Sequence, residues 1–445
     1  MESLRNEIAE LVRGSKVFPR SRKELVRRIL DDPAVLVPIL IEMGSEGLGS
    51  DASTIMAALN AALKQSPSPR LVEPIRKAIT LRPVYFSELA ISLTETLLRH
   101  EMLSKSRNDS RIATLLHRLA DFHGNADNPE KAIACSRAAV RIFRRLSKRG
   151  EPVLENLAVA LLGLVEHLEA SGQFPAAVRT GYEAVRITRE GDTRDVRRIH
   201  ALALCTLGTA LSATGKTKEA LLHLEDGYRR LRKLKRKSRS DQSNYAHAAA
   251  GLAGAYVQLQ DFTRAAPLAD EAFTLHAQLV ADDPGAVLVD YLSTALILSL
   301  VAARCGNMDR AKSVREESAH YVSALAKSQP ETYGIQMVWH LTHIAGALLQ
   351  EDRLDEALPW STRASKSVRS LRENQDIYAA EAHAFTLLTE AAIWMGFKKR
   401  RKAERCAAEA IEAATSLPPD HVERDQLLAE CHKLMEVLGT QPSVG

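Results

Sequence analysis

The stretch His200–Leu234 reads HALALCTLGTALSATGKTKEALLHLEDGYRRLRKL and holds two helical patterns separated by a turn. In the first pattern, apolar residues recur at the three-and-four spacing of one helix face: Leu204, Leu207 and Leu211. Gly215-Lys216-Thr217 then interrupts the pattern, and a second helix opens near Ala220. The small residues Gly208 and Ala220 allow two backbones to approach closely, so this stretch predicts an antiparallel helical hairpin.

The alanine of this second helix recurs along the chain at a nearly constant interval. The corresponding residues are Ala132, Ala177, Ala220, Ala265, Ala311, Ala357 and Ala403, at intervals of 45, 43, 45, 46, 46 and 46 residues. Such a period is typical of stacked units, in which no unit buries its apolar face alone and neighbours share one core. The sequence therefore predicts an all-α solenoid of about seven helical hairpins.

Two of the units carry a recognisable residue pattern on both helices. The third unit contributes Leu207, Gly208, Leu211, Ala220 and Leu224, and the fourth Leu252, Ala253, Tyr256, Ala265 and Ala272. This pattern resembles the tetratricopeptide repeat, over about residues 110–415. The resemblance implies a right-handed superhelix. Because the usual period of that family is about 34 residues, the chain looks like the long-period arrays of kinesin light chains and of immune-receptor-like proteins, in which proline-containing segments such as those at Pro284 and Pro330 join the repeats.

Three segments are expected from this organisation: an N-terminal helical part over 1–105, a repeat array over 106–415, and a capping helix with a short tail over 416–445. The first part predicts six short helices, over 2–12, 22–30, 34–43, 52–64, 72–80 and 85–100, with breaks that include Pro19 and Pro33. These helices could form an independent bundle, such as a death-fold-like adaptor or effector module, or an irregular cap that covers the apolar end of the array.

Composition places the chain among folded proteins, with 45 per cent hydrophobic and 26 per cent charged residues. We expect no window to approach an uncharged apolar membrane span, and the first residues lack the apolar stretch of a signal peptide. The five cysteines lack ligand spacing, which favours reduced core residues: Cys135, Cys205, Cys305, Cys406 and Cys431. These features predict a cytoplasmic protein, with a nuclear location as the alternative.

The net charge of +5 conceals two opposite halves. Residues 130–240 carry 23 basic and 12 acidic side chains, whereas residues 241–445 carry 19 basic and 27 acidic ones. One basic patch is Arg229, Arg230, Arg232, Lys233, Lys235, Arg236, Lys237 and Arg239. It could be a solvated connector, a site for an acidic protein partner, or a nucleic-acid site. A second basic run, 398–402, resembles a nuclear import signal.

No motif for catalysis, a cofactor or a metal is evident. Glycines occur singly at turns and never form a phosphate-binding loop. His340 and His343 lie three residues apart beside Trp339, which would place both rings on one side of a helix, but the sequence shows no third ligand. We therefore expect buried or groove-lining histidines and a protein that is not an enzyme.

The family resemblance implies that the first helix of each repeat lines a concave groove. The matching small residues would leave room for a ligand: Cys205, Thr209, Ser212, Ala250, Gly254, Ser293, Thr342 and Gly346. Glu166 and Glu169 fall on the same face. The expected partner-binding anchors are His247, Gln258, Arg304, Trp339 and Gln350, because aromatic and forked polar groups bury well against a ligand.

The sequence thus favours a non-enzymatic interaction scaffold that holds a peptide or helix of a partner protein in the groove. Two alternatives remain. The protein could be a regulatory or sensor subunit of a defence or signalling complex, with residues 1–105 contacting an effector. It could also bind nucleic acid through residues 229–239, although few aromatic side chains lie nearby for base stacking.

Overall fold

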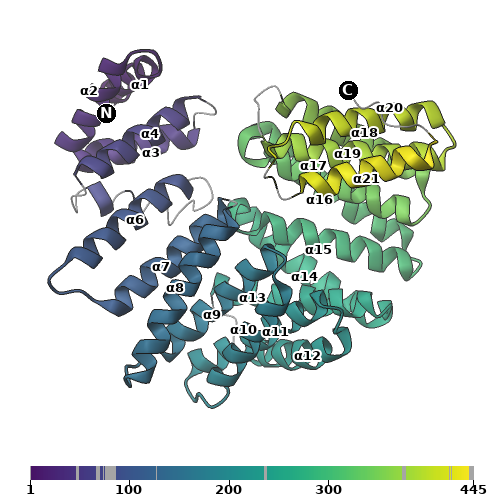
Figure 1. Ribbon diagram of the computed structural model, residues 1–445, viewed down its shortest axis with the longest axis horizontal. Coiled ribbons are helices and arrows are strands. Elements are labelled where there is room, and N and C mark those ends of the chain that lie inside the picture. Colours follow the sequence, from purple (N-terminus) through teal and green to yellow (C-terminus); the bar gives the residue numbers. More distant parts are fainter. Residues whose placement is uncertain are drawn as a thin grey trace. The chain divides into compact units, whose positions relative to one another are not determined.

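The computed structural model describes residues 2–46, 50–66, 71–73, 75, 87–126, 128–234, 238–372, 377–419, 421 and 423–439. Over these residues the regular structure is helical, without any β-strand (Figure 1). The chain divides into two compact units, Met1–Asp290 and Tyr291–Gly445. The predicted all-α class is confirmed.

Five helices precede the repeats: α1 (Glu2–Val17), α2 (Pro19–Asp31), α3 (Pro33–Glu46), α4 (Ser50–Gln65) and α6 (Ser87–Leu103). Pro19 and Pro33 were expected to separate helices, but each begins one. The N–H groups of the first helical turn have no partner within the helix, so proline, which lacks an N–H, loses no hydrogen bond there. These helices share a core with Phe122 of the next helix packed against it. The helix expected over 72–80 lies largely outside the described residues. Whether residues 1–105 form a module or a cap stays a prediction.

The repeats follow as pairs of helices joined by short turns. The first unit contains α7 (Asp109–Asn125), α8 (Pro129–Lys148), α9 (Leu154–Ala170), α10 (Phe174–Thr188), α11 (Arg194–Ala213), α12 (Thr217–Lys233), α13 (Arg239–Gln258) and α14 (Phe262–Asp282). Helix α15 (Pro284–Arg304) crosses the boundary between the units. The second unit continues with α16 (Met308–Ser328), α17 (Pro330–Gln350), α18 (Leu354–Arg372), α19 (Ile377–Gly396), α20 (Arg400–Thr415) and α21 (Arg424–Val437).

Each recurring alanine lies in the second helix of a hairpin and is fully buried: Ala132, Ala177, Ala220, Ala265, Ala311, Ala357 and Ala403. In the third hairpin, a Cβ atom added to Gly208 would lie 2.5 Å from Leu224 Cγ and 3.1 Å from the carbonyl oxygen of Ala220. The helices therefore approach too closely at this point for a larger side chain. The predicted close approach at Gly208 and Ala220 is confirmed.

The turns of six hairpins share one backbone geometry. Five residues before the alanine, a residue with positive φ ends the first helix: Gly172, Gly215, Gln260, Gly306, Asp352 and Lys398. At Gly215 the amide donates to Ser212, and the next amide donates to Leu211, which is the Schellman arrangement that satisfies the last carbonyl groups of a helix. The constant distance from turn to alanine fixes the register of the two helices in each hairpin.

First and second helices form two layers in the first unit. The first helices α7, α9, α11 and α13 lie directly against one another from hairpin to hairpin. The second helices meet mainly through long side chains: Arg144 of α8 pairs with Glu183 of α10, and Tyr182 of α10 donates to Glu219 of α12. The layer of first helices is therefore the narrower, concave one, and the second helices spread apart on the outer face.

Helix α15 departs from one sequence expectation. Val287–Arg304 has the length and the mean hydropathy, 1.7, of a helix that could cross a membrane, although 56 per cent of this stretch is buried within the protein. A first helix packs against its own hairpin and against its neighbours, so it can be apolar on most sides. The cysteines are free thiols, and Cys305, expected in the core, is exposed in the turn that follows α15.

Gly208 and Gly254 provide a matched test of the hairpin packing, because both are helical and a Cβ atom at Gly254 would meet nothing within 4 Å. Gly208→Ala should lower the free energy of unfolding by about 1–3 kcal/mol through overpacking. Gly254→Ala should raise it by about 0.5–1 kcal/mol, since alanine is the better helix former. Urea unfolding followed by circular dichroism measures both, and equal effects of the two variants would contradict the close approach.

Candidate functional site

Three first helices, α9, α13 and α15, bring a group of ionisable side chains together on the concave face of the first unit. Glu166 and Glu169 come from α9, His247 from α13 and Asp290 from α15. His247 Nδ1 lies 3.7 Å from Asp290 Oδ1, one repeat further along the chain. We call the group Glu166, Glu169, His247 and Asp290 the acidic face, because it holds three carboxyl groups and one imidazole.

The two glutamates of the acidic face have unusual proton affinities. Loss of hydration raises the pKa of Glu169 to about 7, and the neighbouring carboxylate of Glu166 adds to this rise. Loss of hydration also raises the pKa of Glu166, together with the charges of Asp121 and Asp290. Like charges this close to one another favour the protonated form of a carboxyl group. A cation from a ligand would relieve both effects.

His247 and Asp290 stabilise one another's charge. Pairing with Asp290 raises the pKa of His247, although reduced hydration opposes this change. Reduced hydration would raise the pKa of Asp290, but His247 and His276 outweigh it and hold that pKa below its ordinary value. The imidazole side chain still exposes 64 per cent of its surface. Reduced hydration here arises from the protein wall around a concave face, and the pair remains open to a ligand.

The acidic character continues towards α7. Asp121 Oδ1 lies 3.5 Å from His167 Nε2 and 3.9 Å from His117 Nδ1. At the other side, Gly254 of α13 leaves open space on the protein surface. The face thus combines carboxylates with a position where the chain carries no side chain. This arrangement can accept a segment with basic side chains.

The two expected anchors of the first unit, His247 and Gln258, lie in different surroundings. His247 belongs to the acidic face. Gln258 lies at the end of α13, where its Oε1 accepts hydrogen bonds from Ser212 and Thr217, each at 2.8 Å. These bonds within the protein occupy the amide oxygen of Gln258, so a ligand would have to use its amide nitrogen. Asp290 was missed in the sequence, where its only signal is a position one helical turn before Ser293.

In the second unit, Trp339 of α17 belongs to an aromatic cluster. Its ring centroid lies 5.9 Å from His343 and 5.4 Å from Phe385 of α19. Phe385 was missed, because nothing in its local sequence distinguishes it from a core residue. Arg304 and Gln350 are exposed at the ends of α15 and α17. The roles of these five anchors in binding a partner stay predictions.

Two expectations about the groove, at Cys205 and Thr342, require correction. Cys205 is buried in the third hairpin, where its Sγ lies against Gly227. Thr342 is buried, with its hydroxyl 2.8 Å from that of Thr386. His340, expected to be buried or to line the groove, is buried and lies 2.8 Å from the Ser318 hydroxyl of α16. A shift of one residue turns a side chain by about 100° around the helix axis, which is enough to move Cys205 and Thr342 from the expected groove into the core.

The basic patch 229–239 is partly neutralised. Arg230 Nε donates to Asp226 at 2.9 Å, and Arg229 contacts the same carboxylate at 3.5 Å. Arg239 donates to the carbonyl of Leu279 at 2.6 Å. Lys235, Arg236 and Lys237 lie outside the described residues. Several cations in the described part of the basic patch therefore make contacts within the protein.

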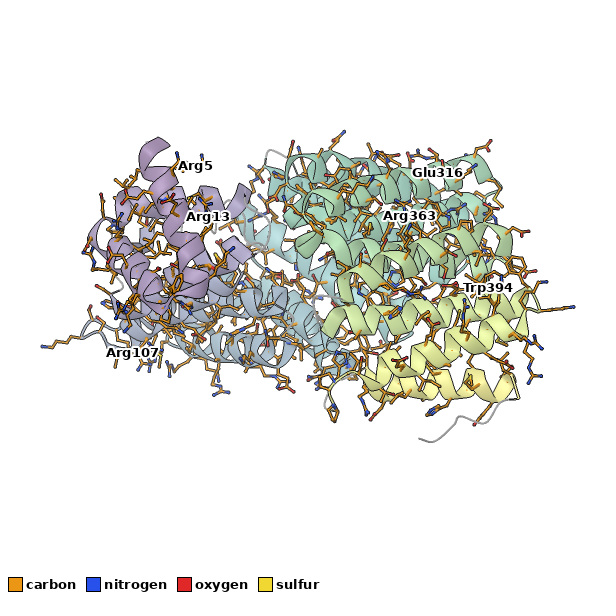
Figure 2. All side chains as sticks on the ribbon, turned by 90° about the horizontal axis from the view of Figure 1, so that it is seen from above. Arg5, Arg13, Arg107, Glu316, Arg363 and Trp394 are labelled. Carbon is orange, nitrogen blue, oxygen red and sulfur yellow. The ribbon has the colours of Figure 1, made fainter. Side chains whose placement is uncertain are left out.

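The second basic run also contributes to local structure. Lys398 is the residue with positive φ in the last hairpin turn. Lys402 Nζ lies 4.0 Å from the ring centroid of Trp394, a cation–π contact, and Trp394 is labelled on its helix in Figure 2. Arg400 pairs with Glu404 at 2.7 Å. A nuclear import role for 398–402 stays a prediction.

Within the part of the chain that the structure describes, histidine, cysteine, aspartate and glutamate side chains form no group of three or more that could hold a metal ion. Among the histidines, burial lowers the pKa of His340 to about 3 and that of His276 to about 4. Both rings are therefore neutral at physiological pH.

No protein-family model and no curated protein matches the chain. Among solved structures, it is similar to the Rap conjugation gene regulator of the plasmid pLS20 in complex with the Phr* peptide, at 13% identity over 86% of this chain and 94% of that chain, with a TM-score of 0.44. Aspartyl phosphate phosphatase F from Bacillus subtilis matches at 11% identity over 95% and 96% of the two chains, with a TM-score of 0.43.

A third similar structure is a putative kinesin light chain from Podosopora anserina with nearly identical TPR-like repeats. It matches at 19% identity over 50% of this chain and 98% of that chain, with a TM-score of 0.37. The hairpins, their turns and the buried alanines establish the fold of the present chain. It is a helical repeat protein built of stacked antiparallel hairpins.

Carbon-detected NMR of the glutamate side chains tests the electrostatics of the acidic face. One carboxyl group should titrate near pH 7, and its signal should disappear in Glu169→Gln. In Glu166→Gln the midpoint of this group should fall, because a neighbouring negative charge has been removed. If every glutamate titrates near the ordinary value of about 4.3, the acidic face is wrongly described.

Proposed function

We propose that the protein is a non-enzymatic interaction scaffold whose concave face binds a peptide or helix of a partner protein. The observation that supports this function most strongly is the acidic face, where reduced hydration raises the pKa of both glutamates and the charge of Glu166 raises that of Glu169 further. Such a pair is destabilised in the free protein. A lysine or arginine side chain placed between the two carboxylates would remove the repulsion and contribute binding free energy.

The surroundings of the acidic face suit a chain segment more than a small ion. The carboxyl groups come from two first helices, Glu166 and Glu169 from α9 and Asp290 from α15, so they extend along the face. Gly254 leaves space next to them, and a backbone can lie there without displacing a side chain. We therefore propose a partner segment with basic residues. The alternative from the sequence, a regulatory or sensor subunit, would instead contact an effector through residues 1–105.

A fluorescein-labelled hexalysine peptide tests this charge preference. Its binding, measured by fluorescence anisotropy, should strengthen as the pH rises from about 6 to 8, because the pKa of Glu169 is raised to about 7 and its carboxyl group loses its proton over this range. At pH 8, Glu166→Gln/Glu169→Gln should weaken binding about tenfold, a loss of about 1.4 kcal/mol. The control Glu151→Gln/Glu190→Gln removes the same charge from exposed positions and should change affinity less than twofold. Equal losses in both variants would exclude a specific site.

Capture of the natural partner tests the face itself. Gly254→Arg should abolish recovery of the partner in affinity purification from the native cell with mass spectrometry, because the new side chain fills open space without touching the core. Leu222→Arg is the control, since Leu222 is 69% exposed on α12 of the outer layer. Trp339→Ala/Arg304→Ala tests the second unit in the same assay. Partners that persist in Gly254→Arg would show that the concave face of the first unit is not used.

A further inference from the structure

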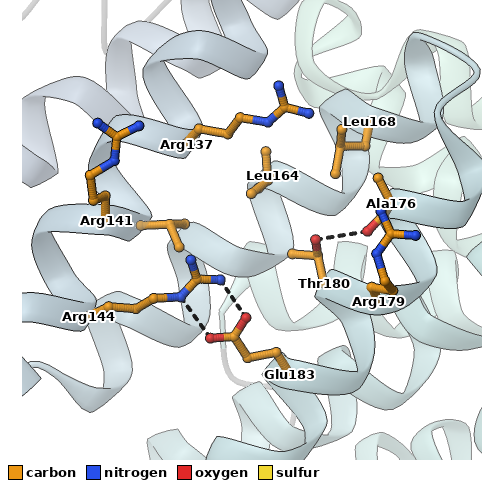
Figure 3. Close-up of a pocket in the computed structure, with 10 residues that line it drawn as sticks. Arg137, Arg141, Arg144, Leu164, Leu168, Ala176, Arg179, Thr180 and Glu183 are labelled. Atoms are coloured by element: carbon orange, nitrogen blue, oxygen red, sulfur yellow. Dashed lines mark hydrogen bonds and ion pairs between the residues drawn. The ribbon is translucent and has the colours of Figure 1, made fainter.

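The outer face of the first unit contains a pocket of about 430 Å³ between α8, α9 and α10 (Figure 3). It exists because the second helices α8 and α10 spread apart over α9. Its floor is aliphatic, formed by Val140, Leu164 and Leu168. Its walls carry four arginines: Arg137, Arg141, Arg144 and Arg179. We call it the arginine pocket.

The cations of the arginine pocket exceed its carboxylates. Glu183 is the one acidic residue that lines it, and it accepts two hydrogen bonds from Arg144, at 2.8 and 2.5 Å. Arg137 donates to the neutral Gln173 at 3.2 Å. Within the part of the chain that the structure describes, Arg141 and Arg179 have no carboxylate partner. An anion in the pocket would therefore neutralise charge that the fold leaves uncompensated.

The arrangement of the arginines indicates the form of the anion. Their guanidinium groups are spread around the pocket and do not converge on one point (Figure 3). A single phosphate needs several donors directed at one place, whereas an extended ligand with several carboxylates can use separated ones. The bidentate pair of Arg144 and Glu183 shows how an arginine here holds a carboxylate. No lining residue is aromatic, so the pocket offers no surface on which a nucleic-acid base could stack.

We infer that the arginine pocket is a second binding site, which takes an acidic peptide segment of a partner protein with its carboxylates on Arg141 and Arg179. It lies on the outer layer of helices, apart from the acidic face on the inner layer. The two sites have opposite charge. A partner, or two different partners, could therefore engage both layers of the first unit at once. The inference does not depend on the concave groove and would stand if that proposal failed.

A fluorescein-labelled hexaglutamate peptide tests the site in the full-length protein. Wild type should bind it, and Arg141→Glu/Arg179→Glu should weaken binding by at least about tenfold, because two attractive charges become repulsive. Lys148→Glu/Arg186→Glu makes the same change of charge on the same two helices outside the pocket, and should cost less than about threefold. Glu166→Gln/Glu169→Gln should leave hexaglutamate binding unchanged.

Several outcomes would overturn the inference. Equal losses in the two charge-reversed variants would mean attraction by net charge alone. Displacement of the peptide by inorganic phosphate, but not by chloride at equal ionic strength, would assign the site to phosphate. Tighter binding of a single-stranded RNA of the same charge would assign it to nucleic acid. A dimer in sedimentation velocity that Arg141→Glu/Arg179→Glu dissociates would make a second copy the occupant. If charge reversal prevents folding, Arg141→Gln/Arg179→Gln gives the same comparison.

Discussion

The structure depends on the close contact between the two helices of each hairpin. At Ala220 and its six equivalents the second helix has only a methyl group, and this group is fully buried. In six of the hairpins the preceding turn has a residue with positive φ five residues earlier. Because turn and contact are separated by a constant distance, each hairpin has the same register. The repeated register is what allows successive hairpins to stack with one shared core.

The stacking determines where charged side chains lie on the two layers of helices. First helices lie against one another, so their exposed residues are brought together on the concave side. Four carboxyl groups there come from three first helices: Asp121 of α7, Glu166 and Glu169 of α9, and Asp290 of α15. Second helices spread, so long side chains must reach across the gaps, and arginine is well suited to this because it is long and makes two parallel bonds with a carboxylate. The pair of Arg144 and Glu183 shows this use. The same spreading leaves a pocket lined by the remaining arginines.

The sequence predicted the elements of this fold well, because the signal for a hairpin is local and repeated seven times. It predicted the site less well. Cys205 and Thr342 were assigned to the groove, yet each is buried, because a helix position differs from its neighbour by 100° and a family register transfers only approximately. Asp290 and Phe385 were missed because their importance comes from residues one repeat away. The arginine pocket depends on three helices and on the spread between two of them, which no local pattern encodes.

The two layers of helices separate the basic from the acidic side chains of the same segment. Residues 130–240 have an excess of basic over acidic side chains, and the sequence alone suggested one basic partner surface at 229–239. In the structure, arginines of α8 and α10 lie on the outer layer, while Glu166 and Glu169 of the same stretch lie on the inner one. A net positive segment therefore presents an acidic inner face and a basic outer face. Net charge describes how such a chain attracts partners at long range, whereas helix register determines which face each of them meets.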